Sequence, residues 1–151
     1  MTTKDRHFAG LQNLYLAAPI NEFYRPSIEV SDSEATIEIE VTEDFFHAAG
    51  AVHGSVYFKM LDDAAFFAAN SLEREVFVLT TSFTTYLTRP ISSGRLRSVG
   101  RVVNQNKSQF IAEAVAHDSE GNEVGRGSGV FVRSKIPLSE ALGYSRGAEA
   151  S

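Results

Sequence analysis

Residues 50–71, GAVHGSVYFKMLDDAAFFAANS, decide the fold of this chain. A His-Gly pair opens a run of small and aromatic apolar residues that is long enough for about five turns of helix, which predicts a helix over residues 54–70. Apolar side chains surround this helix on nearly all sides. A sheet must therefore wrap around it to remove those side chains from water.

Two adjacent aspartates on this helix face different surroundings. At about 100° of rotation per residue, Asp62 falls on the same side as Phe58, whereas Asp63 shares its side with Lys59. We expect Asp63 to form an i,i+4 pair with Lys59 on a solvated stripe, where such a pair contributes about 0.2–0.5 kcal/mol. Asp62 has apolar neighbours, and a desolvated carboxylate must be hydrogen-bonded, paired or shifted in pKa. Asp62 is the candidate catalytic group, and capping of a backbone segment is the alternative.

The segments around the helix have strand patterns, the clearest being the alternation of apolar and acidic residues in EATIEIEVT. Turns rich in Gly, Asp and Asn separate the later segments. The expected strands are residues 34–42, 75–88, 95–103, 109–117 and 124–133. This order predicts an α+β protein with an antiparallel sheet of about five to six strands around the central helix.

The two ends of the chain are expected to add small elements to one domain over residues 1–151, whose core spans about 27–133. Apolar residues at helical spacing predict a short helix over residues 7–18. In the C-terminal extension, residues 134–151, the segment 137–144 is expected to form a short helix. A polar, disordered tail is expected after it.

Composition narrows the function classes. The chain has 151 residues, 43% of them apolar, and a net charge of −5 without a block of Lys or Arg. This balance argues against a nucleic-acid partner. The absence of cysteine excludes disulfides and thiolate nucleophiles and fits a reducing compartment. The longest apolar run is too short for a membrane span, and the four histidines lack metal-ligand spacing. We expect a cytoplasmic protein with no metal and no membrane or nucleic-acid partner.

Short motifs stand at fixed spacing around the predicted helix. They are Gly50 with Val52-His53-Gly54, Leu61-Asp62 with Ala64, Asn70-Ser71, Tyr86-Leu87-Thr88-Arg89-Pro90, and Gly94. Together they resemble the hot-dog fold thioesterases of the PaaI type over about residues 34–133. The nine-residue step from His53 to Asp62, combined with the Arg-Pro and Gly94 spacing, makes the resemblance specific. It implies a hot-dog fold.

The resemblance implies hydrolysis of the thioester of a small aryl or aliphatic acyl-CoA. Gly54 begins the helix, so its N–H is an unpaired donor at the positive end of the helix dipole and would bind the thioester carbonyl oxygen. Asp62 of the facing subunit would act as a general base on water or as a direct nucleophile. Thr80 matches the strand position where related enzymes carry a hydroxyl near the attacking water. A plain strand residue is the alternative for Thr80.

Two positions depart from the family pattern. His47 stands where PaaI-type members commonly have Asn, and His53-Gly54-Ser55 replaces the usual His-Gly-Gly. His47 either replaces the Asn amide as a water-orienting partner or adds a titration near neutral pH. His53 and Ser55 are assigned to substrate binding, with His53 expected to fix the geometry of Gly54 rather than to act directly. Substrate range and pH optimum stay open.

Cationic and apolar side chains are expected to hold the two ends of the CoA ester. Arg89, Arg95 and Arg97 flank the turn at residues 90–94 and are candidates for the acidic nucleotide, with a solvated basic turn as the alternative. Phe58 would contact the acyl chain. Because CoA is part of the substrate, no separate cofactor is expected.

The resemblance also bears on assembly and leaves two rival functions. One hot-dog layer leaves a sheet edge and half of the active site unfinished, so we expect a homodimer, with a dimer of dimers implied by the resemblance.

The first rival is a hot-dog enoyl-thioester dehydratase or hydratase, in which His47 or His53 acts with Asp62. The second is a non-catalytic acyl-CoA-binding module.

Overall fold

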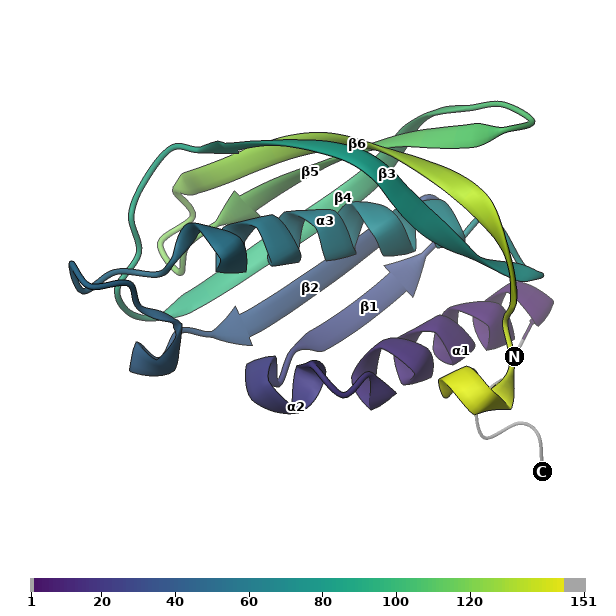
Figure 1. The fold of residues 1–151 in the computed structure, drawn as a ribbon, viewed down its shortest axis with the longest axis horizontal. Helices are drawn as coiled ribbons and strands as arrows, with labels where there is room; N and C mark the ends of the chain where they lie inside the picture. Colours follow the sequence, from purple (N-terminus) through teal and green to yellow (C-terminus); the bar gives the residue numbers. More distant parts are fainter. Residues whose placement is uncertain (1, 146–151) are drawn as a thin grey trace.

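The computed structural model describes residues 2–145. Two N-terminal helices precede a pair of strands, a long central helix and four further strands (Figure 1). The elements are α1 (Thr3–Ala17), α2 (Asn21–Tyr24), β1 (Ser27–Ser31), β2 (Glu34–Glu40), the 3-10 turn η1 (Glu43–Phe45), α3 (Gly54–Asn70), β3 (Val76–Leu87), β4 (Arg95–Gln105), β5 (Gln109–His117), β6 (Glu123–Pro137) and the 3-10 turn η2 (Glu140–Leu142).

The strands form one sheet in the order β1-β2-β4-β5-β6-β3, with every neighbouring pair antiparallel. The sheet curves around α3, and β1 and β3 are its edges (Figure 1). The predicted α+β class, central helix and number of strands are confirmed. β1 is an additional strand at the start of the expected core, and β6 continues beyond the predicted end at residue 133.

α3 packs directly on the sheet where small residues allow close approach. A β-carbon on Gly100 of β4 would overlap the backbone of Ala64 in α3. On β6, β-carbons at Gly127 and Gly129 would overlap the ring of Phe83, which lies over these two glycines. The glycines of the last strand therefore serve close packing, as the sequence indicates.

The chain ends meet on one side of the core. A capping box between Thr2 and Asp5 starts α1 earlier than the predicted residue 7. The buried ring of His7 lies 2.7 Å from the hydroxyl oxygen of Tyr144 and 2.8 Å from the carbonyl oxygen of Asn70. The predicted helix over residues 137–144 is reduced to η2, because β6 runs on to Pro137. The predicted disordered tail lies largely outside the described residues.

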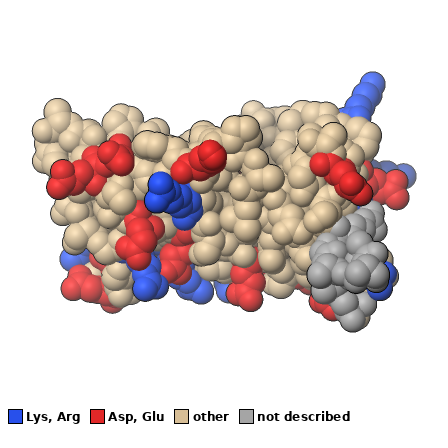
Figure 2. All heavy atoms as spheres, turned by 90° about the horizontal axis from the view of Figure 1, so that it is seen from below, with Lys and Arg blue, Asp and Glu red and all other residues tan. Residues whose placement is uncertain are grey.

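The surface carries charges of both signs. On the face shown in Figure 2, acidic and basic side chains are interspersed, with uncharged surface between them. Within residues 2–145, no helix has the length and hydropathy of a membrane span. The same residues contain no cluster of three His, Asp or Glu side chains placed to hold a metal ion.

Candidate functional site

Asp62 lies on the side of α3 that faces the first half of β3. Thr80 Oγ1 donates a hydrogen bond to Asp62 Oδ1 at 2.9 Å, so the structure brings these two predicted residues together. Burial raises the pKa of Asp62 from 3.8 to about 6. The charge of Asp63 adds to the rise, whereas the Thr80 hydrogen bond and Lys59 lower the pKa. Such a carboxylate is mostly ionised at pH 7 and can still accept a proton, which suits a general base.

Asp63 and Lys59 form the predicted i,i+4 ion pair, but the stripe is not solvated. The Lys59 and Asp63 side chains are only 12% and 19% exposed. Tyr15 donates a hydrogen bond to Asp63 Oδ2 at 2.7 Å. The Lys59 ammonium lies 5.0 and 4.9 Å from the ring centres of Tyr15 and Tyr24. The helices α1 and α2 place these two tyrosines over the Lys59–Asp63 pair. The helical period of α3 does not predict this cover, because it depends on other segments of the chain.

A hollow of about 320 Å³ opens beside Asp62, between α3, β3 and the end of α1. Because Lys59 and Asp63 pair with each other, Asp62 is the carboxylate in this hollow without an ion pair among the described residues. The lining consists of Leu14, Tyr15, Ala18, Ile20, Asn21, Lys59, Asp62, Asp63, Phe66, Phe67, Phe77, Leu79 and Thr80. The hollow therefore combines one carboxylate that lacks an ion pair among the described residues with mainly apolar walls, as ligand sites do.

Gly54 is the first residue of α3, and Asn70 is the last. His53 is the N-cap residue, and its Nδ1 accepts a hydrogen bond from the Ser55 N–H at 3.0 Å. Ser55 Oγ lies 2.9 Å from the same nitrogen. The first N–H groups of a helix have no acceptor within the helix, so the Gly54 N–H is left to bind an anion or a carbonyl oxygen. His53 and Ser55 thus position Gly54.

A groove of about 370 Å³ lies over Gly54. It brings together the predicted residues His47, Gly54 and Arg89, whose carbonyl oxygen accepts a hydrogen bond from Tyr57 at 2.9 Å. His47 Nδ1 accepts a hydrogen bond from the Ala49 N–H at 3.0 Å. A neutral imidazole that accepts at Nδ1 carries its hydrogen on Nε2, so His47 retains a donor for a water molecule or a substrate.

One chain does not bring Gly54 and Asp62 to the same point. Eight positions along α3 separate them, which corresponds to about 12 Å at 1.5 Å per residue. The two residues also line different hollows. Groups that act on one carbonyl must lie within roughly 3–3.5 Å of the reacting atoms. Within one described chain, Gly54 and Asp62 therefore cannot act on the same carbonyl group.

Phe58 lies on α3 between Gly54 and Asp62. Its side chain is 42% exposed, and its ring packs edge-on against Phe83 of β3 at 5.7 Å between centres. It lines neither hollow. Phe58 is instead a partly exposed apolar residue between α3 and β3.

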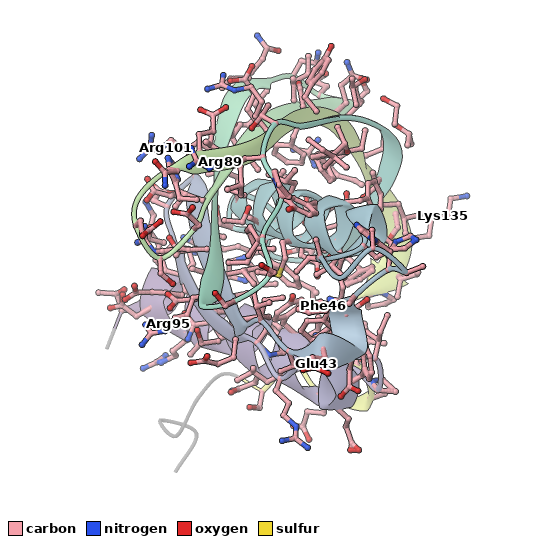
Figure 3. All side chains as sticks on the ribbon, turned by 90° about the vertical axis from the view of Figure 1, so that its left-hand side faces the viewer. Glu43, Phe46, Arg89, Arg95, Arg101 and Lys135 are labelled. Atoms are coloured by element: carbon pink, nitrogen blue, oxygen red, sulfur yellow. The ribbon has the colours of Figure 1, made fainter. Side chains whose placement is uncertain are left out.

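The three arginines are not brought together. Arg89 lines the groove at the helix start and forms no ion pair within the described part of the chain. Arg95 lies 2.9 Å from Glu38 and 3.5 Å from Glu40, and Arg97 lies 4.0 Å from Glu38. These pairs join β4 to β2, and Arg95 points outward at the margin of the molecule (Figure 3). Binding of a nucleotide by Arg95 and Arg97 stays a prediction that would require these pairs to open.

Sequence reasoning missed the residues that cover the polar stripe of α3. Tyr15 has the apolar spacing of a core residue within the expected N-terminal helix, and nothing in its surroundings marks its hydroxyl as a partner of Asp63. The two residues are 48 positions apart. Their contact depends on how α1 packs on α3, and no local signal in the sequence specifies that packing.

Comparison with known proteins is consistent with this architecture. The family model of the thioesterase superfamily matches residues 49–125, a range that contains Gly54, Asp62 and Thr80. A search of the curated proteins found no match. The predicted resemblance to this superfamily is confirmed.

Solved structures share the fold. The PaaI protein of the phenylacetic acid degradation operon of E. coli is 17% identical, with 90% of this chain and 99% of that chain covered and a TM-score of 0.81. A conserved protein from Pseudomonas aeruginosa is 19% identical, with coverage of 79% and 96% and a TM-score of 0.74. A mutant thioesterase from P. aeruginosa is 14% identical, with coverage of 84% and 92% and the same TM-score of 0.74. The fold is the hot-dog fold, and because the family model covers half of the sequence, the chain belongs to the thioesterase superfamily.

Proposed function

We propose that the protein is an acyl-CoA thioesterase, which cleaves the substrate to a free acid and CoA. The observation that carries the proposal is the environment of Asp62. Its carboxylate accepts a hydrogen bond from Thr80, has a pKa raised to about 6 and opens onto a mainly apolar hollow. Membership of the thioesterase superfamily supports the same reaction class.

In the proposed reaction, the Gly54 N–H binds the carbonyl oxygen and stabilises the negative charge that develops on it. Asp62 takes a proton from water as the water oxygen attacks the carbonyl carbon. The carbon–sulfur bond then breaks, the CoA thiolate leaves with its electron pair, and the proton held by Asp62 passes to the thiolate, which restores the carboxylate. In the alternative route, Asp62 itself attacks to form an anhydride, which water hydrolyses. Both routes give the same acid and thiol, and Thr80 orients the carboxylate in either one.

A homodimer would complete this site. β3 is an edge strand, and Leu79, Tyr86 and Leu87 on it are 42%, 60% and 52% exposed. An unpaired edge with exposed apolar side chains favours pairing with another chain. We infer that a second copy pairs along β3, so that Asp62 of the partner subunit faces Gly54. A dimer of dimers remains a prediction from the resemblance.

Binding of the rest of the substrate is assigned on the same basis. Arg89 is the candidate for the acidic nucleotide, because it lines the groove of Gly54 without an ion pair in the described part of the chain. His47 would orient water or substrate through Nε2. Phe58 lies one turn before Asp62 on α3 and is 42% exposed, so it would contact the substrate beside the thioester group.

Thiol release from acyl-CoA esters tests the proposal. We expect the wild type to cleave some of these esters and Asp62→Asn to lower kcat by about 10²–10⁴-fold, the contribution of a general base. Asp32→Asn is the matched control, because Asp32 is 55% exposed and pairs with Lys4 at the surface. Asp63→Asn is unsuitable as a control, since it would leave Lys59 buried and unpaired. Hydration of an enoyl-CoA, or binding without thiol release, would contradict the proposal.

A second pair of variants tests the carbonyl-binding donor. Gly54→Pro removes the N–H at the first position of α3, where proline is well tolerated, and the ψ of 144° at His53 suits a residue before proline. Gly54→Ala keeps the N–H, and its β-carbon would lie 3.1 Å from Leu87 Cδ1. We expect Gly54→Pro to lower kcat by about 10²-fold or more, and Gly54→Ala to retain most of the activity. Equal losses would contradict the role of the N–H.

A further inference from the structure

A second hollow of about 620 Å³ lies beyond the one that contains Asp62, at the C-terminal end of α1. Leu14, Ala18 and Phe77 line both hollows, so the two adjoin at these side chains. The lining of the outer hollow consists of Leu14, Ala17, Ala18, Pro19, Phe77, Ile136, Glu140, Ala141, Leu142 and Gly143. We refer to the two hollows together as the channel.

The channel becomes more apolar with distance from Asp62. In the inner hollow, Lys59 and Asp63 pair with each other. In the outer hollow, Glu140 is the one charged side chain among the lining residues that belong to the described range 2–145. The side chains of Ile136 and Leu142 remain 42% and 37% exposed at its end. A ligand that enters past Asp62 would therefore meet apolar surface and few hydrogen-bonding partners.

The outer wall of the channel is held in place by contacts with the core. The hydroxyl oxygen of Tyr144 lies 2.7 Å from Nδ1 of the buried His7. The Leu138 N–H donates a hydrogen bond to the Glu75 carbonyl oxygen at 3.0 Å. The segment that carries Leu142 is thus anchored on both sides, which preforms the apolar wall.

We propose that the channel holds the acyl chain of the substrate, and that the substrates are straight aliphatic acyl-CoA esters of medium or long chain. The proposal rests on the thioesterase function proposed above. With the thioester carbonyl near Asp62 and Thr80, the chain would follow β3 toward Phe77, a path of about 10 Å at roughly 3.3 Å per residue. It would then enter the outer hollow.

The position of the outer hollow next to the inner one favours a long chain over a compact aromatic group. An aryl group would fill the inner hollow and leave the outer apolar surface in water. A linear chain removes both from water, and each buried methylene strengthens binding by roughly threefold to fourfold. We therefore expect kcat/KM to rise from butyryl-CoA to octanoyl-CoA, to stay high for dodecanoyl-CoA and to be lower for phenylacetyl-CoA.

Substitution at the junction of the hollows tests the path. Ala18→Phe places a ring where the inner and outer hollows meet, and we expect it to lower the ratio of kcat/KM for dodecanoyl-CoA to that for butyryl-CoA by at least about tenfold. Leu16→Phe is the matched control, because Leu16 is on the same helix, 51% exposed and outside both linings. If Ala18→Phe fails to fold, Leu142→Asp puts a charge at the outer end and should lower the same ratio.

A binding measurement separates this proposal from the proposed function. S-dodecyl-CoA and S-butyl-CoA are thioethers without a carbonyl group, so calorimetry reports on the channel without turnover. Tighter binding of S-dodecyl-CoA without hydrolysis of any ester would support the channel and overturn the thioesterase function. Hydrolysis without a preference for longer chains, or an unchanged ratio in a folded Ala18→Phe protein, would overturn the channel and leave the thioesterase function standing.

Discussion

Asp62 is a carboxylate whose surroundings hold its pKa within reach of neutral pH. Burial in the hollow raises the pKa, and the adjacent charge of Asp63 raises it further. The Thr80 hydroxyl and the Lys59 ammonium act in the opposite direction, since both favour the ionised form. These opposing influences leave a carboxylate that is ionised at pH 7 and more basic than an exposed aspartate.

The pH dependence of activity follows from this balance. Because the base must be ionised in the free enzyme, we expect kcat/KM to rise with pH through about 6 and to level off above that value. Thr80→Val removes a hydrogen bond that favours the ionised form, so this limb should move to higher pH. A pH–rate profile of both proteins measures the shift. An unmoved limb, or one displaced to lower pH, would show that Thr80 does not act on Asp62 in this way.

The same shift predicts an effect on stability. The pKa of Asp62 is higher in the folded protein, so ionisation costs folding free energy: the cost is absent below the unfolded value of 3.8, grows up to about 6 and is constant above. Two pKa units correspond to at most about 3 kcal/mol. We expect Asp62→Asn to increase the free energy of unfolding at about pH 8 by about 1–3 kcal/mol and to change it little near pH 4. Urea denaturation at both values measures this, and a destabilised variant at the higher pH would contradict it.

At the scale of elements, the start of α3 depends on an imidazole in the capping position. His53 Nδ1 accepts the hydrogen bond from the Ser55 N–H and thereby fixes the turn in which Gly54 lies. The nearby bridge between Phe46 and Val52 ties the preceding loop to itself. The geometry of the Gly54 N–H therefore rests on one side-chain cap and a short closed loop.

Loss of this cap should affect stability and activity together. We expect His53→Ala to lower the free energy of unfolding by about 1 kcal/mol, the usual contribution of an N-cap, and to reduce kcat because Gly54 loses its support. His53→Asn has a side-chain oxygen that can accept the same hydrogen bond, so it should restore both. If His53→Asn is stable but as inactive as His53→Ala, the imidazole has a direct role in the reaction.

The elements that could be predicted from sequence are those whose own residues specify them. The helix over residues 54–70 has the predicted bounds. A capping loop precedes it, and its residues are nearly all small or aromatic and apolar. The strand at 109–117 also matches, since turn residues flank it on both sides. α1 begins before the predicted residue 7, because the capping box of Thr2 and Asp5 starts the helix at Thr3. The C-terminal helix shrank to η2 because pairing with β3 extends β6.

The site could be predicted only in part, for a related reason. The helical period separates Asp62 from the Lys59–Asp63 pair, and the His-Gly pair places Gly54 at the start of α3, as the structure has them. The burial of the Lys59–Asp63 pair depends on α1 and α2 packing over it, and the ion pairs of Arg95 depend on the register of β4 with β2. Contacts between distant segments of this kind leave no periodic signal in a single sequence.

At the scale of the whole molecule, one curved sheet wraps around one helix, and the candidate residues Gly54 and Asp62 lie at separate places along that helix. Gly54 opens onto a groove at the start of α3, and Asp62 opens onto the channel farther along the helix. The edge strand β3 and its exposed apolar side chains run beside both. We infer that each active site combines Gly54 of one subunit with Asp62 of the partner subunit.

Mixing two inactive variants tests that claim most directly. Asp62→Asn and Gly54→Pro are each inactive as homodimers, but a hybrid dimer would contain one site with both defects and one intact site. Subunits exchanged at equal concentration form hybrids in about half of the dimers, so the account predicts thiol release at about a quarter of the wild-type rate. Activity that stays at the level of the separate variants, with hybrid formation verified by mass spectrometry, would contradict a site shared between subunits.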